Sequence, residues 1–186
     1  MKKGKIRKRL DKAKSGMKVA NIYLNYDRHY YNAIPLAIGE SLVLSVLEDD
    51  FILDGYAVFR IKDITKIKVK NDLCNKIISD IGLLNEINPP NIDIQNWRVV
   101  FESIISMNIN IIIEAKTQLG NDYDFYIGKV IKAGKNTAVF RHFDANGIWQ
   151  SEPYKIPYSE IFNIKLLDRY STVFSKYVSA PTYPAY

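Results

Sequence analysis

Cationic side chains at the start of the chain are the residues whose type and spacing most clearly suggest a chemistry. Within residues 1–18 the only acid is Asp11, and the nine basic side chains are Lys2, Lys3, Lys5, Arg7, Lys8, Arg9, Lys12, Lys14 and Lys18. Lys and Arg neutralise phosphates and release condensed counterions, so this run predicts a basic arm that contacts RNA or DNA without reading its sequence. The alternative is a disordered segment that only keeps the protein soluble.

A second cationic pattern lies within a predicted strand, where lysines occupy alternate positions between apolar residues. A strand would place these lysines on one wet face, and tyrosines from a Tyr-rich stretch can offer stacking surfaces beside them. The candidate single-strand surface comprises Lys66, Lys68, Lys70, Tyr30 and Tyr31. Lysine also protects edge strands from unwanted pairing and tyrosine is common in strands, so a purely structural role stays open.

Motifs of enzymes and metal sites are missing from the sequence. The two histidines, His29 and His142, lie far apart, and there is no P-loop, GxGxxG, GxSxG or HExxH pattern. The acidic run at residues 48–50 reads as a solvated turn rather than a cation site. We therefore expect a non-catalytic binding protein with no cofactor and no metal, and an enzyme with an unrecognised site remains an alternative.

Composition and charge limit the cellular compartments and the classes of protein that this sequence fits. The chain has 186 residues, 47% of them hydrophobic and 25% charged, which is typical of a globular protein. Its net charge of +6 is the sum of +8 in the first 18 residues and −2 in the remainder. The single Cys74 cannot form an intramolecular disulfide, which favours a reducing compartment. No apolar stretch suits a secretory signal or a membrane span. We expect a cytoplasmic protein with no membrane partner.

The apolar pattern changes period along the chain. Residues 19–70 and 109–178 alternate as strands do, with turns predicted at Asp54-Gly55 and Asn146-Gly147. Residues 71–108 follow helical spacing instead. Two helices are expected there, one capped by Asn71 or Asp72 and one capped by Asp93.

A short internal repeat appears when the chain is shifted by 97 residues. Residues 61–69 then lie over residues 158–166, and the matched pairs are Asp63 with Glu160, Ile64 with Ile161, Ile67 with Ile164, and Lys68 with Lys165. Each copy reads as a strand, one helical turn and a strand. That element closes many small β-barrels, because the turn lets a strongly bent sheet meet itself.

The second copy, roughly residues 109–177, resembles the small β-barrels of the Sm-like and SH3-like type in bacterial proteins. The residues that carry the resemblance are Phe125 to Val130, Asp144 to Gly147, Ile156 to Ile161, and Arg169-Tyr170. The resemblance implies a fold more than a function. Sm proteins contact RNA bases through a motif that contains an Arg-Gly pair. In this sequence Arg60 is followed by Ile61, so the resemblance does not imply that the protein binds RNA as an Sm ring does.

These patterns predict an α+β fold with two small, strongly bent β-barrel-like units of the Sm/SH3 type, joined by a helical segment. The expected divisions are a basic arm (1–18), a first, degenerate barrel unit (19–70), a helical connector (71–108), a second barrel unit (109–178) and an extended tail (179–186). The leading function is nucleic-acid contact through the arm. The alternative is a protein-interaction or regulatory module, which could also self-associate through sheet edges, with an arm that only aids solubility.

Overall fold

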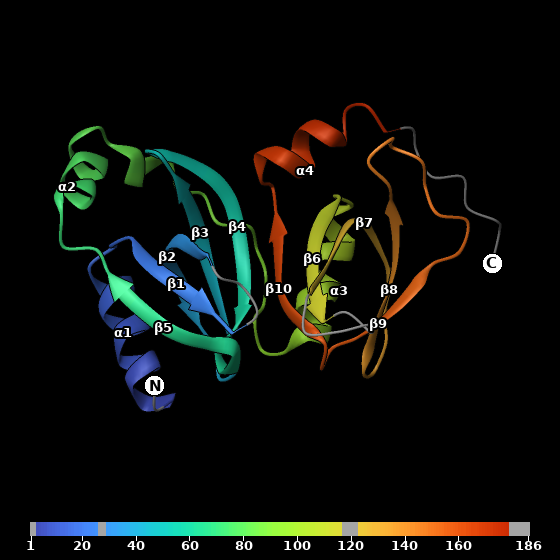
Figure 1. The fold of residues 1–186 in the computed structure, drawn as a ribbon, viewed down its shortest axis with the longest axis horizontal. Helices are drawn as coiled ribbons and strands as arrows, with labels where there is room; N and C mark the ends of the chain where they lie inside the picture. Colours follow the sequence, from blue (N-terminus) through green and yellow to red (C-terminus); the bar gives the residue numbers. More distant parts are fainter. Residues whose placement is uncertain (1–2, 26–28, 117–122, 179–186) are drawn as a thin grey trace.

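A single antiparallel sheet forms the body of the molecule in the computed structural model, which describes residues 3–25, 29–116 and 123–178 (Figure 1). Across the sheet the strands follow the order β5-β1-β2-β3-β4-β10-β6-β7-β8-β9. Their bounds are β1 (Ala20–Leu24), β2 (Tyr30–Ile38), β3 (Leu42–Asp49), β4 (Ile52–Arg60), β5 (Ile64–Val69), β6 (Ile111–Lys116), β7 (Tyr123–Ala133), β8 (Thr137–Phe143), β9 (Tyr154–Pro157) and β10 (Ile161–Leu166). Among the described residues, more residues belong to strands than to helices.

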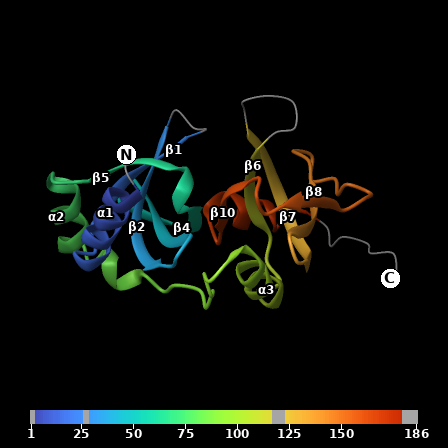
Figure 2. The same ribbon diagram turned by 90° about the horizontal axis from the view of Figure 1, so that it is seen from below.

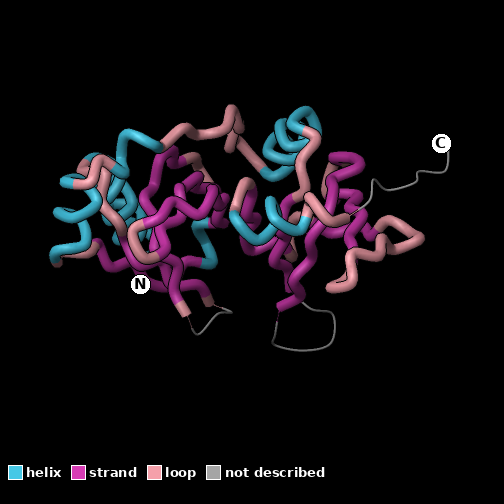
Figure 3. The backbone as a smooth tube through the Cα atoms, turned by 90° about the horizontal axis from the view of Figure 1, so that it is seen from above, coloured by secondary structure: helices cyan, strands magenta, loops and turns pink. Residues whose placement is uncertain are grey.

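Helices lie around this sheet rather than between two separate bodies (Figures 2 and 3). They are α1 (Lys3–Ser15), α2 (Leu73–Asp80), α3 (Trp97–Met107) and α4 (Arg169–Phe174), with 3₁₀ turns η1 (Ile61–Asp63) and η2 (Leu83–Glu86). Asp72 caps α2 by accepting a hydrogen bond from the backbone N–H of Cys74, as predicted. The predicted cap of α3 is wrong, because Asn96 rather than Asp93 accepts from the first turn.

The prediction of two small barrel-like units joined by a helical segment is wrong. Strand β4 of the first half pairs directly with β10 of the second, with Val58 opposite Ile164, so all ten strands belong to one open sheet. We call the β4–β10 pairing the seam. An unpaired strand edge leaves backbone N–H and C=O groups without partners, and pairing β4 with β10 satisfies both edges at once.

Both ends of the seam are fixed by polar contacts between the halves. At one end the guanidinium of Arg60 donates to the carbonyl of Ser159 at 2.6 Å. At the other end the backbone N–H of Arg169 donates to Asp54 Oδ1 at 2.7 Å. These contacts come from opposite ends of β4, so the halves are held along the length of the strand.

The strand order is itself repeated. The first five strands run β5-β1-β2-β3-β4 across the sheet, and the second five run β10-β6-β7-β8-β9. The short sequence repeat falls at corresponding places, since η1 leads into β5 and the turn before Ile161 leads into β10. The second copy has a hydrogen-bonded turn at residues 158–160 instead of the helical turn that we expected in both copies.

Apolar side chains fill both faces of the sheet. On one face, Val58 and Ile164 belong to a core that includes Trp97 and Phe101 of α3, and the ring of Phe101 stacks on Tyr158 at 5.7 Å. On the other face Phe59 belongs to a core that α1 covers. Because the middle of the sheet is covered twice, its central strands read as nearly continuous apolar runs.

Helix α1 is part of this second core. Ile6, Leu10 and Ala13 project from one stripe of the helix and are fully buried against β2 and β5. Their spacing of four and three residues places them one above another on a helix. The basic segment is therefore an ordered helix over residues 3–15 and not a free tail. In the described residues no helix is long and apolar enough to cross a lipid bilayer.

Candidate functional site

The basic residues of α1 form the outer surface of the helix. Burial of the apolar stripe turns its cations outward, and the exposed ones are Lys5, Lys8, Arg9, Lys12 and Lys14. In the part of the chain that the structure describes, none of them forms an ion pair with a carboxylate. Lys2 lies outside the described residues, and Lys3 begins the helix. The helix thus carries a fixed array of uncompensated positive charge.

Two arginines of α1 bind the helix to the sheet through backbone carbonyls. Arg7 Nη2 donates to the carbonyl of Gly39 at 2.8 Å, and Arg9 Nη1 donates to the carbonyl of Ile67. Ile67 lies between Lys66 and Lys68 in β5. Arg9 therefore joins α1 to the edge strand β5, and Figure 1 shows the helix and the strand side by side. The side chain of Ile67 packs with α1, so Lys66 and Lys68 lie on the opposite face of the strand.

Lysines and tyrosines come together on β5, β1 and β2. The ammonium groups of Lys66 and Lys68 lie 5.1 and 5.8 Å from the ring centroid of Tyr23. Tyr23 pairs with Tyr30 across β1 and β2, and their ring centroids are 5.3 Å apart. Tyr30 is 50% exposed, so its ring is available to a ligand. We call the exposed cations of α1 together with these four residues the basic surface.

Two predicted members of the single-strand site lie elsewhere. Lys70 Nζ lies 3.8 Å from Glu48 Oε2 and 3.6 Å from the thiol of Cys74, so its charge is compensated locally. Tyr31 follows Tyr30 in β2 and therefore faces the other side of the strand. Its hydroxyl donates to Glu114 Oε2 at 2.8 Å, which places it at the seam.

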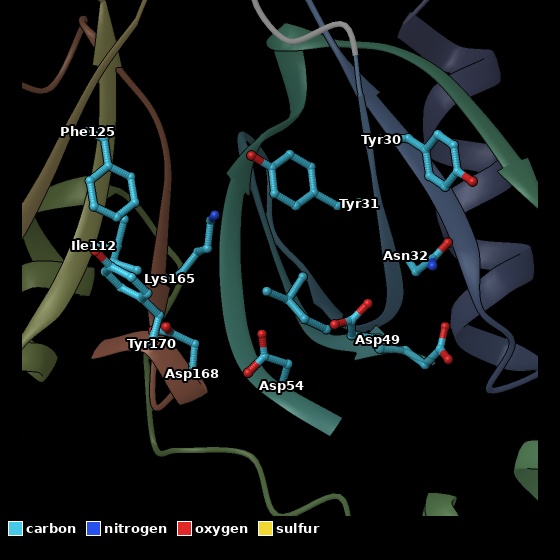
Figure 4. A pocket seen from close by; sticks show the side chains of 12 residues that line it. Tyr30, Tyr31, Asn32, Asp49, Asp54, Ile112, Phe125, Lys165, Asp168 and Tyr170 are labelled. Carbon is cyan, nitrogen blue, oxygen red and sulfur yellow. The ribbon is translucent and has the colours of Figure 1, made fainter. Parts of the chain in front are cut away.

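A pocket of about 420 Å³ opens at the seam, and both halves of the sheet line it (Figure 4). This volume falls within the range of small-ligand sites. We call it the seam pocket, and its lining residues are Tyr30, Tyr31, Asn32, Leu47, Glu48, Asp49, Asp54, Ile112, Phe125, Lys165, Asp168 and Tyr170. Tyr30 thus borders both the basic surface and the pocket.

A buried polar network holds Tyr31 and Lys165, two of the residues that line the seam pocket. Glu114, only 2% exposed, accepts from Tyr31 at 2.8 Å and from the amide of Asn163 at 2.7 Å, and it pairs with Lys165 Nζ at 2.8 Å. Burial alone would raise the pKa of Glu114, but the charge of Lys165 and these hydrogen bonds outweigh it and hold that pKa below its ordinary value. Lys165 also lies 5.2 Å from the ring centroid of Tyr31.

Four carboxylates also line the pocket, and three of them already accept hydrogen bonds from backbone N–H groups. Glu48 Oε1 accepts from the N–H of Phe51, Asp54 Oδ1 accepts from the N–H of Arg169, and Asp168 caps α4 through Ser171. Asp49 is exposed and its side chain makes no hydrogen bond or ion pair with any described residue. Asp49 is therefore the carboxylate most open to a ligand.

Metal ligation finds no support in the parts of the chain that are described, where no group of three or more His, Cys, Asp or Glu side chains converges. His142 instead packs edge-on against Tyr126 at 5.2 Å, and burial lowers its pKa. Asp49 ends β3, and the turn that follows consists of Asp50 and Phe51, which both adopt positive φ. The turn predicted at Asp54-Gly55 is wrong, because both residues continue β4.

Sequence reasoning missed the seam pocket as a site. Its members Asp49, Lys165 and Tyr170 are widely separated along the chain, and only the pairing of β4 with β10 brings them together. No local pattern signalled it, because alternation in β2 predicts opposite sides for Tyr30 and Tyr31, and yet both line the pocket. A scan against models of protein families, a search of curated proteins and a search of solved structures each found no match to this chain.

Proposed function

We propose that this protein is a non-catalytic binding protein that holds single-stranded nucleic acid on its basic surface. The observation that carries the proposal is the ordered, uncompensated charge of α1, which lies beside the edge strand β5 with Lys66 and Lys68 on the other face of that strand. Cations held in place by a buried stripe lose less freedom on binding than those of a flexible arm. We assign this activity to the cytoplasm, because the single Cys74 fits a reducing compartment.

Single strands fit the basic surface better than a duplex does. Aromatic rings stack on unpaired bases, and Tyr30 presents a half-exposed ring beside the lysine-covered Tyr23. A duplex keeps its bases stacked inside and offers only phosphates to such a surface. The phosphates would follow the cations of α1 and pass around the edge strand β5 to Lys66 and Lys68, and one base would stack on Tyr30.

Charge-neutralised variants test the proposal. The test variant carries Lys5→Gln, Lys8→Gln and Lys12→Gln, all exposed on α1; the control carries Lys132→Gln, Lys135→Gln and Lys155→Gln, all exposed in the second half. Both lose the same charge, and glutamine keeps the helix propensity of lysine. Binding of fluorescent single-stranded RNA and DNA is measured over a range of salt. The test variant should lower the slope of log affinity against log salt by about 2, at about 0.7 per phosphate contact.

A second comparison separates stacking from charge. Tyr30→Ala should weaken single-strand binding by about tenfold, because stacking of one base on a ring contributes about 1–3 kcal/mol, and it should leave duplex binding unchanged. The control is Tyr177→Ala, which changes a tyrosine that is 85% exposed. Equal salt slopes in the test and control lysine variants would overturn the proposal. A protein-interaction module whose basic helix only aids solubility would give that result.

A further inference from the structure

We infer that the seam pocket binds a guanidinium group such as the side chain of arginine. This inference goes beyond the proposed function, since the pocket has a charge opposite to that of the basic surface. Its lining includes four carboxylates, those of Glu48, Asp49, Asp54 and Asp168, and one cation, Lys165. Glu48 is already paired with Lys70 at 3.8 Å, which leaves three carboxylates with no ion-pair partner among the described residues. The charge of Lys165 is compensated by Glu114 at 2.8 Å. The pocket therefore attracts a cation and repels phosphate.

Two carboxylates have oxygens available for such a cation. Asp49 ends β3, and its side chain has no partner among the described residues. Asp54 lies in the adjacent strand β4, and its Oδ1 accepts from the N–H of Arg169, whereas its Oδ2 has no partner within the described part of the chain. Figure 4 shows both side chains at the same side of the pocket. Carboxylates in this position can accept the parallel N–H groups of a guanidinium.

Aromatic rings form the wall that faces these carboxylates. Phe125 and Tyr170 meet edge to face with centroids 5.9 Å apart, and they are 45% and 51% exposed. Figure 4 shows them across the cavity from Asp49 and Asp54. A flat, weakly hydrated guanidinium stacks on such rings while donating in its own plane, whereas an ammonium is a strongly hydrated point charge. The combination of rings and carboxylates therefore selects a planar cation.

Other ligand classes fit the pocket less well. A carboxylate ligand would need Lys165, whose ammonium is already paired with Glu114. A nucleotide would bring its phosphates toward Asp49 and Asp54. A divalent cation would need several converging oxygen ligands, and no such group occurs in the described part of the chain.

Titration of the full-length protein with four probes tests the inference. The probes are agmatine, the blocked peptide Gly-Arg-Gly, the same peptide with citrulline in place of arginine, and the same peptide with lysine. Citrulline has the shape of arginine without its charge, so it isolates the ionic contribution. We expect the arginine peptide to bind at least about tenfold more tightly than the citrulline peptide, because charge-assisted hydrogen bonds are about twice as strong as neutral ones. The lysine peptide should fall between them.

Two neighbouring variants provide a matched comparison. Asp49→Asn removes a carboxylate that lines the pocket, and Asp50→Asn removes the next one, which does not line it and whose positive φ asparagine accepts. Asp49→Asn should weaken the arginine peptide about tenfold and leave single-strand binding unchanged, whereas Asp50→Asn should change neither. Tyr170→Ala should also weaken the peptide, through loss of stacking.

The outcomes separate the two sources of a guanidinium. Tighter binding of the peptide than of agmatine indicates an arginine of a protein partner, and equal binding indicates a small free cation; both support the inference. Equal affinity for the arginine and citrulline peptides overturns it, as does equal behaviour of Asp49→Asn and Asp50→Asn. Nucleic-acid binding is measured on the same samples. If the arginine peptide does not bind, the proposal for the basic surface can therefore still be judged from its own data.

Discussion

The hydroxyl of Tyr31 on β2 donates a hydrogen bond of 2.8 Å to Glu114 on β6, and this contact joins the two halves of the sheet across the seam. Tyr31→Phe removes the donor and keeps the ring, which also packs against Phe59 at 5.3 Å. We expect a loss of about 1 kcal/mol in the free energy of unfolding, measured by urea denaturation. Tyr177→Phe, at an exposed position, should have no effect. Equal stability of both variants would show that the contact contributes nothing.

Acid should weaken the seam through Glu114. The pKa of this carboxyl is lowered from its ordinary 4.5, so its stabilisation is present above that pH and is lost as pH falls through the lower value of the folded state. Glu114→Gln should cost up to about 3 kcal/mol at pH 7, since it leaves Lys165 unpaired in a largely buried position. The gap between wild type and variant should narrow below pH 4.5. A gap that stays constant from neutral to acid pH would contradict this assignment.

Gly55 should tolerate no side chain. Its φ is +72°, and a Cβ there would lie 2.4 Å from the backbone nitrogen of Asp168 and 2.6 Å from the carbonyl of Leu166. Gly55→Ala must therefore push β4 away from β10 or distort the start of α4, and we expect a loss of more than about 2 kcal/mol in the free energy of unfolding. Gly4→Ala is the control, because a Cβ at that position would meet no atom within 4 Å. Thermal unfolding of the two variants decides the matter.

Leu10 should be essential to the first half of the sheet. Its side chain is fully buried with Ile6 and Ala13, and Leu10→Ala should cost about 2–5 kcal/mol through lost burial and a cavity. Lys8→Ala, on the exposed side of the same helix, should change stability by less than about 0.5 kcal/mol. Deleting residues 1–18 would remove this part of the core together with the charges. Substitutions of exposed lysines therefore report on binding more cleanly than truncation does.

Local patterns predicted the elements better than their arrangement. The helical spacing of Trp97, Phe101 and Ile104 correctly indicated α3, and Asp72 correctly marked the start of α2. The seam could not be predicted, because each strand's alternation shows which face is buried and not which strand lies beside it. Val58 and Ile164 meet only because the whole sheet aligns them.

The candidate site was predictable in part. The run of cations gave the charged side of α1, whereas its anchoring by Ile6, Leu10 and Ala13 was hidden within a segment dominated by lysine and arginine. Alternation placed Lys66, Lys68 and Lys70 on one side of β5, but the pairing of Lys70 with Glu48 depends on a neighbouring strand. The pair Asp54-Gly55 is typical of a turn in sequence, but both residues lie within β4. Gly55 is needed there because it has no Cβ, which lets the backbone of β4 lie close to that of Asp168.

The position of β10 in the middle of the sheet sets the order in which the molecule can be completed during translation. A ribosome synthesises β4 about a hundred residues before β10, so β4 emerges with one edge unpaired and waits for its neighbour. A message that ended before residue 161 would yield a product whose two halves both expose that edge, on β4 and on β6. Incomplete chains of this protein should therefore be prone to aggregate. The exposed edges of β4 and β6 are the feature by which chaperones and proteases would recognise such chains.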